Sequence, residues 1–95
     1  MTRLEHLLVI LAEECAEVAH RTAKVLRFGL DDVEPGKDLM NAEQLSVEVA
    51  HVIAMAQMLV DEGAILPPRL ADILNKKIAV EKWLLHSVTQ GALTA

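Results

Sequence analysis

The chain has 95 residues, a net charge of −5 and a single cysteine, Cys15. This length predicts one domain over residues 1–95, and the absence of a Lys/Arg-rich run argues against nucleic acid as a main partner. One cysteine cannot form an intramolecular disulfide, which fits a reducing cytoplasm. The most apolar stretch, residues 47–60, is interrupted by charged and polar side chains, so we expect no membrane-spanning segment.

The first helix is predicted from its two ends and from the spacing between them. Thr2 followed by Glu5 has the form of a capping box, which marks a helix start, and Gly29 is a natural stop. Between them, apolar or small residues recur in steps of four and three, as in a helix that packs in a bundle. These positions are Leu4, Leu8, Leu11, Cys15, Val18, Thr22 and Val25.

The rest of the chain divides into a loop and two further helices. Residues 29–40 are rich in acidic and turn-forming residues without usable periodicity, which predicts a loop. Asn41 with Gln44 repeats the pattern of a helix cap, so a second helix is expected to begin there and to end at Gly63. The Pro-Pro pair at residues 67–68 fits the first turn of a third helix.

The second helix is apolar on nearly every face between residues 47 and 60. A helix of this kind is buried all round, but three helices cannot enclose one of their own number completely. We therefore expect an all-α fold, an antiparallel helical bundle completed by homodimerisation or tetramerisation.

Acidic residues form a pattern on the first two helices. Glu13, Glu14 and Glu17 lie within one turn, and Glu48 and His51 are spaced i, i+3 inside the apolar stretch. On a solvated surface the first group would mean nothing, and Glu48 paired with a Lys or Arg would be a structural ion pair. Inward-facing Glu-x-x-Glu and Glu-x-x-His pairs on facing helices, however, are how helical bundles hold divalent metals.

The ligand types indicate which metal such a site would take. Oxygen ligands from Glu14, Glu17 and Glu48 favour a hard ion, Mg²⁺, while the nitrogen of His51 also makes Mn²⁺ possible. Mg²⁺ held by few protein ligands completes its shell with water and substrate phosphates, which points to phosphate chemistry.

These residues carry a resemblance to a known family. The segment Glu-Glu-Cys-Ala-Glu at residues 13–17, followed by Glu-Val-Ala-His at residues 48–51, resembles the Glu-Glu-x-x-Glu and Glu-x-x-Asp signature of the MazG-like all-α nucleotide pyrophosphohydrolases. The resemblance implies two antiparallel helices in an oligomeric bundle. It also implies hydrolysis of a nucleoside triphosphate, NTP or dNTP, to the monophosphate and pyrophosphate.

The resemblance also implies roles for the residues of this chain. Glu14, Glu17 and Glu48 would bind Mg²⁺, and Glu13 would be a further ligand or would orient the attacking water. His51 stands where the family has Asp and is the fourth expected ligand. A neutral imidazole brings no charge, so this site should attract Mg²⁺ less than four carboxylates would.

Basic and amide side chains are candidates for binding the triphosphate. They are Lys24, Arg27, Asn75, Lys77 and Lys82. The alternative for any one lysine is a solvated basic face. The two aromatic residues, Phe28 and Trp83, are interpreted as core or interface anchors, with stacking on a base as the alternative.

Two other functions remain open at this point. One is a catalytically silent helical interaction module of the same fold. The other is a pyrophosphohydrolase that acts on a phosphoribosyl nucleotide. Metal binding separates the first from a catalyst, because a ligand that binds only the native state raises stability.

Overall fold

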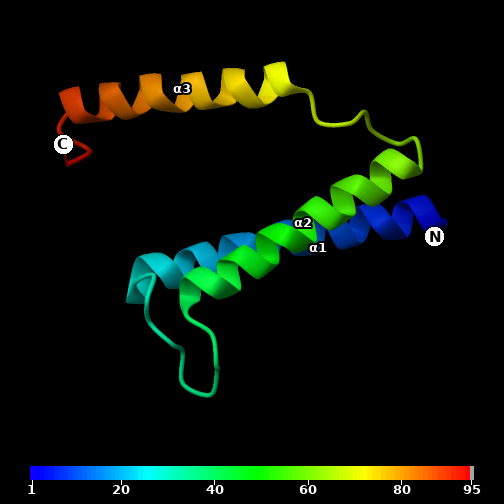
Figure 1. Cartoon of the computed structure of the whole chain (residues 1–95), viewed down its shortest axis with the longest axis horizontal. Helices are drawn as coiled ribbons and strands as arrows, with labels where there is room; N and C mark the ends of the chain where they lie inside the picture. The colour runs from blue at the N-terminus through cyan, green and yellow to red at the C-terminus, as the bar shows by residue number, and fades with distance from the viewer. Residues whose placement is uncertain (95) are drawn as a thin grey trace. The chain divides into compact units, whose positions relative to one another are not determined.

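The computed structural model describes residues 1–94, and in that range it contains three α-helices and no β-strand. The helices are α1 (Arg3–Phe28), α2 (Asn41–Asp61) and α3 (Leu70–Thr89), as Figure 1 shows. The prediction of an all-α fold is confirmed. None of these helices combines the length and the apolar character that crossing a membrane requires.

The chain divides into two units, one of residues 1–65 and one that begins at Leu66. The first unit contains α1, α2 and the loop between them, and the second contains α3. The prediction of a single domain stays a prediction. The first unit carries the acidic motifs, so the fold around them is described in most detail.

Both predicted ends of α1 are confirmed. The Thr2 hydroxyl accepts a hydrogen bond from the Glu5 backbone N–H at 3.1 Å, and the Glu5 carboxylate accepts one from the Thr2 backbone N–H at 3.1 Å. This is the capping box, which satisfies two backbone donors at the helix start. Gly29, with φ of 96°, ends the helix and donates its N–H to the Val25 carbonyl at 2.8 Å.

The helices α1 and α2 run antiparallel as a hairpin and pack against each other (Figure 1). The buried core lies where α1 begins and α2 ends, and consists of Leu7, Met55 and Leu59, with Ile10 and Leu11 packed against it. It is small. Other apolar side chains of the hairpin, such as Leu8 and Ile53, are exposed.

The stripe of α1 that faces α2 differs from the predicted seam. Leu7 is buried, whereas Leu4 and Leu8 are 38% and 45% exposed. Leu11, Val18 and Val25 of the predicted seam are half-buried, so the prediction was correct in part. It was wrong for Leu4 and Leu8, because α1 is apolar on more than one side and spacing alone does not say which side meets α2. Nor is α2 buried all round within one chain, because Val47 and Ile53 are 44% and 53% exposed.

The start of α2 also corrects a prediction. The N-cap is Met40, whose backbone N–H donates to the Glu43 carboxylate at 3.1 Å, and Asn41 is the first helical residue. Two backbone bonds tie this start to the loop, from Asn41 N–H to the Asp32 carbonyl at 2.9 Å and from Ala42 N–H to the Leu30 carbonyl at 3.0 Å. The loop thus folds back on α2 and frees the Asn41 side chain for another role.

The predicted ends of the later helices need small changes. Gly63, with φ of 75°, follows the end of α2 by two residues. The Pro-Pro pair at residues 67–68 precedes α3 instead of forming its first turn, and Arg69 is the N-cap. Arg69 is still extended, with ψ of 134°, so the helix starts only at Leu70.

Candidate metal centre

Three of the predicted ligands come together between α1 and α2. Glu14, Glu48 and His51 each place a ligand atom within 4.8 Å of the others. His51 Nδ1 lies 3.3 Å from an Oε2 atom of each glutamate. The side chains of Glu14 and Glu48 are 25% and 18% exposed, and that of His51 is 51% exposed, so the carboxylates are inside the hairpin and the imidazole is at its edge.

Helix periodicity explains why these residues meet. Glu14 follows the buried Leu7 by seven residues, which is two turns, so both lie on the face of α1 that packs on α2. Glu48 precedes the buried Met55 by seven residues and faces α1 for the same reason. His51 is one turn from Glu48 on that face. The hairpin core thus holds the two carboxylates opposite each other.

The role of the His51 ring depends on its tautomer. Nδ1 lies within hydrogen-bond distance of Glu48 Oε2, and with a hydrogen on Nδ1 it would donate to that carboxylate, since a carboxylate only accepts. The same N–H would lie 3.3 Å from Glu14 Oε2 and reduce the repulsion between the two carboxylates. A cation at the same place would do this more strongly. To bind a cation through Nδ1, His51 must carry no hydrogen on that nitrogen, because a ligating nitrogen offers its lone pair. Otherwise the ring would have to turn.

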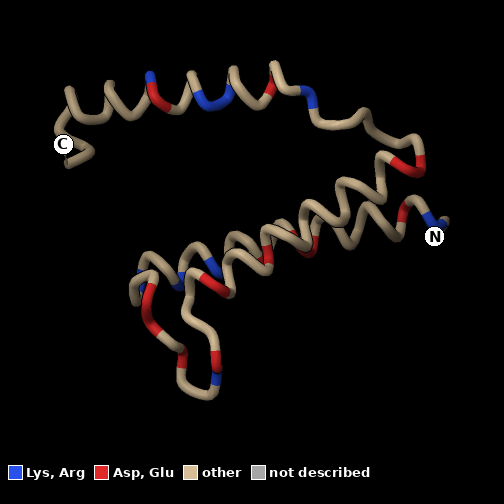
Figure 2. Tube along the Cα trace, in the orientation of Figure 1, with Lys and Arg blue, Asp and Glu red and all other residues tan. Residues whose placement is uncertain are grey.

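The three residues lie beside a cavity and have no Lys or Arg partner in residues 1–94. In residues 1–94, neither Glu14 nor Glu48 has a salt bridge to a Lys or Arg; both pair only with His51. Acidic residues recur along both helices and their loop (Figure 2). A cavity of about 240 Å³ lies beside the cluster, lined by Glu14, His51, Ala54 and Met55.

The other two predicted carboxylates lie outside this cluster. Glu13 and Glu17 are both exposed, and neither places an oxygen among the three ligand atoms. Glu17 is one turn from Glu14 on α1, close to the same side of the helix. Their predicted roles in binding metal or orienting water stay predictions.

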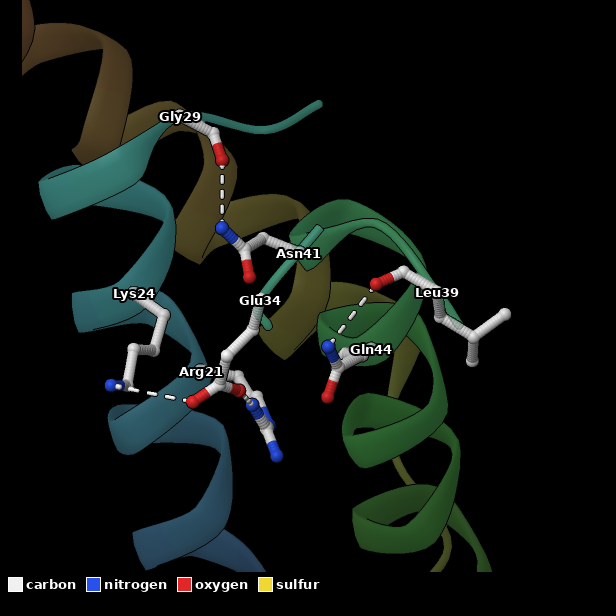
Figure 3. Close-up of polar contacts among 7 residues, drawn as sticks. All are labelled: Arg21, Lys24, Gly29, Glu34, Leu39, Asn41 and Gln44. Carbon is white, nitrogen blue, oxygen red and sulfur yellow. Dashed lines mark hydrogen bonds and ion pairs between the residues drawn. The ribbon is translucent and has the colours of Figure 1, made fainter. Parts of the chain in front are cut away.

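A second polar cluster lies at the loop end of the hairpin and was missed in the sequence (Figure 3). Arg21 Nη1 is 3.3 Å from Glu34 Oε2, and Lys24 Nζ is 3.8 Å from Glu34 Oε1. Asn41 is 1% exposed and donates its side-chain N–H to the Gly29 carbonyl at 3.0 Å. The i, i+3 spacing of Arg21 and Lys24 was the available signal, but only the folded loop brings Glu34 to them.

The structure places the predicted phosphate-binding residues in two groups. Lys24 is half-buried with its Nζ 5.6 Å from the centre of the Phe28 ring, and the Arg27 guanidinium is 4.8 Å from the same ring. Lys24 therefore already has an anionic and an aromatic partner. The remaining three are exposed on α3 in the second unit; they are Asn75, Lys77 and Lys82. Their predicted role is not tested.

A fold alone does not specify an activity, so only the side chains of the candidate site can indicate a function. The motifs on α1 and α2 carry the resemblance to the MazG-like enzymes, which stays a hypothesis. Comparison of the chain with models of protein families, with curated proteins and with solved structures finds no match.

Proposed function

We propose that this protein is a Mg²⁺-dependent nucleotide pyrophosphohydrolase that converts an NTP or dNTP to the monophosphate and pyrophosphate. The observation that supports the proposal most directly is the convergence of Glu14, Glu48 and His51 from two facing helices. Two half-buried carboxylates without a Lys or Arg partner are a costly arrangement unless a cation compensates them. The resemblance of the two motifs to the MazG-like signature supports the same activity.

In this proposal the carboxylates of Glu14 and Glu48 hold the metal, and His51 contributes the lone pair of a ring nitrogen. Bound Mg²⁺ would polarise a phosphoryl oxygen and neutralise phosphate charge. The packing of α1 on α2 keeps the two carboxylates opposite each other before substrate arrives, so little ordering is needed when it binds.

Two further carboxylates have roles in this scheme. Glu17 and Glu13 are exposed and form no salt bridge in residues 1–94. Each can therefore accept a hydrogen bond from the attacking water or take its proton. Glu17 is assigned first, because it lies one turn from Glu14 on nearly the same side of α1. The cavity beside Glu14 and His51 gives a phosphoryl group access to the cluster.

The apolar residues left exposed on the hairpin support a homodimer or homotetramer. Leu8, Val49 and Ile53 are 45%, 42% and 53% exposed within one chain. A second copy that packs on this surface would complete a helical bundle and would add its own side chains to the site. The candidates for holding the triphosphate in this scheme are Arg27, Asn75, Lys77 and Lys82, and we expect the enzyme to act in the cytoplasm.

One observation favours a second candidate, a catalytically silent helical module. His51 Nδ1 lies 3.3 Å from both carboxylates, so with a hydrogen on Nδ1 the imidazole would satisfy the cluster in part without a metal. The two candidates differ in their response to divalent ions. A metal-binding catalyst should melt at a higher temperature in millimolar Mg²⁺ or Mn²⁺, and a silent module should not respond.

The deciding experiment is a screen of NTPs and dNTPs with Mg²⁺ and with Mn²⁺ that measures pyrophosphate release. We expect pyrophosphate and the monophosphate in equal amounts, and no release when EDTA is present. A phosphoribosyl nucleotide belongs in the same screen, since cleavage of it alone would assign the related activity. Release of inorganic phosphate with a diphosphate product would contradict the proposal, because a different bond would be cleaved.

A further inference from the structure

A cavity at the loop end of the hairpin is separate from the metal cluster. Its volume is about 300 Å³, and its lining comes from the last turns of α1, the loop and the first residue of α2. The lining residues are Lys24, Phe28, Asp32, Glu34, Pro35 and Asn41. This volume is at the small end of the range for ligand pockets, so it suits one ring system better than a whole nucleotide.

Asn41 lines this cavity and carries an unused hydrogen-bond acceptor. Its side chain is almost fully buried, and its Nδ2 donates to the Gly29 carbonyl at 3.0 Å. Because a carbonyl only accepts hydrogen bonds, the atom of the Asn41 amide that faces Gly29 must be the nitrogen, and the other atom is the oxygen Oδ1. Oδ1 is buried with no partner in residues 1–94, and it points away from Gly29 toward the side of Glu34 (Figure 3). A buried unpaired acceptor is costly, which indicates a missing donor.

The charged groups of the cavity can be sorted by whether they are already used. Glu34 accepts a hydrogen bond from Arg21 and forms an ion pair with Lys24. The Lys24 ammonium is 3.8 Å from Glu34, so it keeps capacity to donate elsewhere. Asp32 forms no salt bridge or side-chain hydrogen bond in residues 1–94, although its backbone carbonyl accepts from Asn41 N–H. The cavity therefore offers one donor, Lys24, and two free acceptors, Asp32 and Asn41 Oδ1.

We propose that this cavity binds the guanine base of the substrate. The Watson–Crick edge of guanine carries one acceptor, O6, and donors at N1 and N2, which matches the free groups of the cavity in kind and number. Uracil and thymine present two acceptors and one donor, and adenine and cytosine lack the pair of adjacent donor nitrogens. The ring of Phe28 provides an apolar wall beside the base.

The position of the cavity is compatible with the metal cluster. Asn41 precedes Glu48 by seven residues on α2, so the two lie on one face about 10 Å apart along the helix. A nucleotide extended along the hairpin would place its base in the cavity and its phosphates near Glu14 and Glu48. The inference that the bound base belongs to a nucleotide rests on the proposed function. The match between the donors and acceptors of guanine and those of the cavity does not depend on it.

The test uses calorimetric titration of the whole protein in EDTA with GMP, IMP, AMP and UMP. We expect saturable binding of GMP. IMP lacks only the 2-amino group of GMP and should bind about tenfold more weakly, the loss expected for one hydrogen bond to a charged group. UMP should bind most weakly. Working without metal separates this test from the metal site, which is followed by Mg²⁺ titration in the absence of nucleotide.

Two neighbouring aspartates give a matched pair of variants. Asp32→Asn removes the free carboxylate of the cavity and should weaken GMP binding about tenfold while reducing the preference over IMP. Asp31→Asn removes the same charge one residue away, outside the lining, and should leave GMP binding unchanged. Melting curves of both variants check that the loop still folds.

Three results would overturn the proposal: no saturable binding of GMP, equal binding of GMP and UMP, or equal effects of the two aspartate variants. None of these bears on Mg²⁺ binding by Glu14 and Glu48. Conversely, GMP binding that depends on Asp32, in a protein that neither binds Mg²⁺ nor hydrolyses nucleotides, would support the cavity assignment and remove the proposed catalysis.

Discussion

Glu48 is the residue on which the proposed metal centre depends most, since it is the less exposed of the two converging carboxylates. Glu48→Gln keeps the shape of the side chain and the helix propensity but removes the charge that attracts a cation. We expect most of the pyrophosphohydrolase activity and the Mg²⁺-dependent rise in melting temperature to be lost, with helicity by circular dichroism unchanged. Glu81→Gln, the same change at an exposed position of α3, should preserve all three properties. Near-normal turnover by the Glu48 variant would show that the metal site is wrong.

His51 is the residue at which the two candidate functions differ. Its Nδ1 lies 3.3 Å from both Glu14 and Glu48, and His51→Asp replaces the imidazole by a third carboxylate. Without metal, the added repulsion should lower the melting temperature. With Mg²⁺, the added charge should tighten binding, maintain or raise the activity and reduce any preference for Mn²⁺. Calorimetric titration with each ion, alongside melting curves, measures both effects.

A catalytically silent module predicts a different result for His51→Asp. If His51 is purely structural, the substitution should destabilise the hairpin to the same extent with and without Mg²⁺. Mg²⁺ affinity should then not increase. The comparison therefore uses the metal-dependent difference in melting temperature, which a general loss of stability does not change.

At the scale of single elements, the start of α1 depends on its cap. Thr2→Ala removes the hydroxyl that accepts from the Glu5 backbone N–H and should cost about 1 kcal/mol of stability. Thr22→Ala makes the same chemical change inside α1, where the hydroxyl donates to the Val18 carbonyl. Alanine has the higher helix propensity there, so stability should be unchanged or slightly higher. Urea unfolding monitored by circular dichroism measures both, and equal losses would refute the capping role.

The junction of the loop with α2 depends on Asn41. Asn41→Ala removes a buried hydrogen bond to the Gly29 carbonyl and leaves space beside it, at an expected cost of about 1–3 kcal/mol. Gln57→Ala, at an exposed position in the interior of α2, should change stability little. Denaturant unfolding compares them. If Asn41→Ala left the free energy of unfolding unchanged, the hydrogen bond to Gly29 would not be what holds the loop against the hairpin.

At the scale of the whole molecule, the exposed apolar surface of the hairpin predicts self-association. A core of three buried side chains is small for a stable fold, and the apolar Val49 and Ile53 remain more than two-fifths exposed. Light scattering at micromolar concentration should therefore give the mass of a dimer or tetramer. Ile53→Glu would bury a charge in the contact and should shift the mass toward the monomer.

The control for this prediction lies outside the hairpin. Gln90→Glu adds a charge at an exposed polar position after α3, so it should leave the assembly intact. A stable, well-folded monomer of the unaltered protein at micromolar concentration would contradict the prediction. It would also place the whole proposed site within one chain.

Much of the secondary structure could be predicted from local signals. The Thr2 and Glu5 capping box and the Gly29 stop were correct because they depend on neighbouring residues only. The cap of α2 was misplaced by one residue, since a backbone bond from Asn41 to distant Asp32 decides how the helix begins. The facing stripe of α1 was predicted only in part, with Leu11, Val18 and Val25 correct and Leu7 missed, because two apolar stripes satisfy the same helical period.

The sequence by itself determined that the chain is all-helical, and it identified Glu14, Glu48 and His51, because ligand spacing on a helix is a local property. Only the tertiary structure decided that these three converge while Glu13 and Glu17 stay outside, since the register of α1 against α2 depends on the packing of Leu7 against Met55 and Leu59. The cavity at Asn41 likewise exists only after the loop folds back on α2. Residues distant in sequence become neighbours through packing and backbone hydrogen bonds. The periodicity of apolar residues along the sequence predicts neither of these contacts.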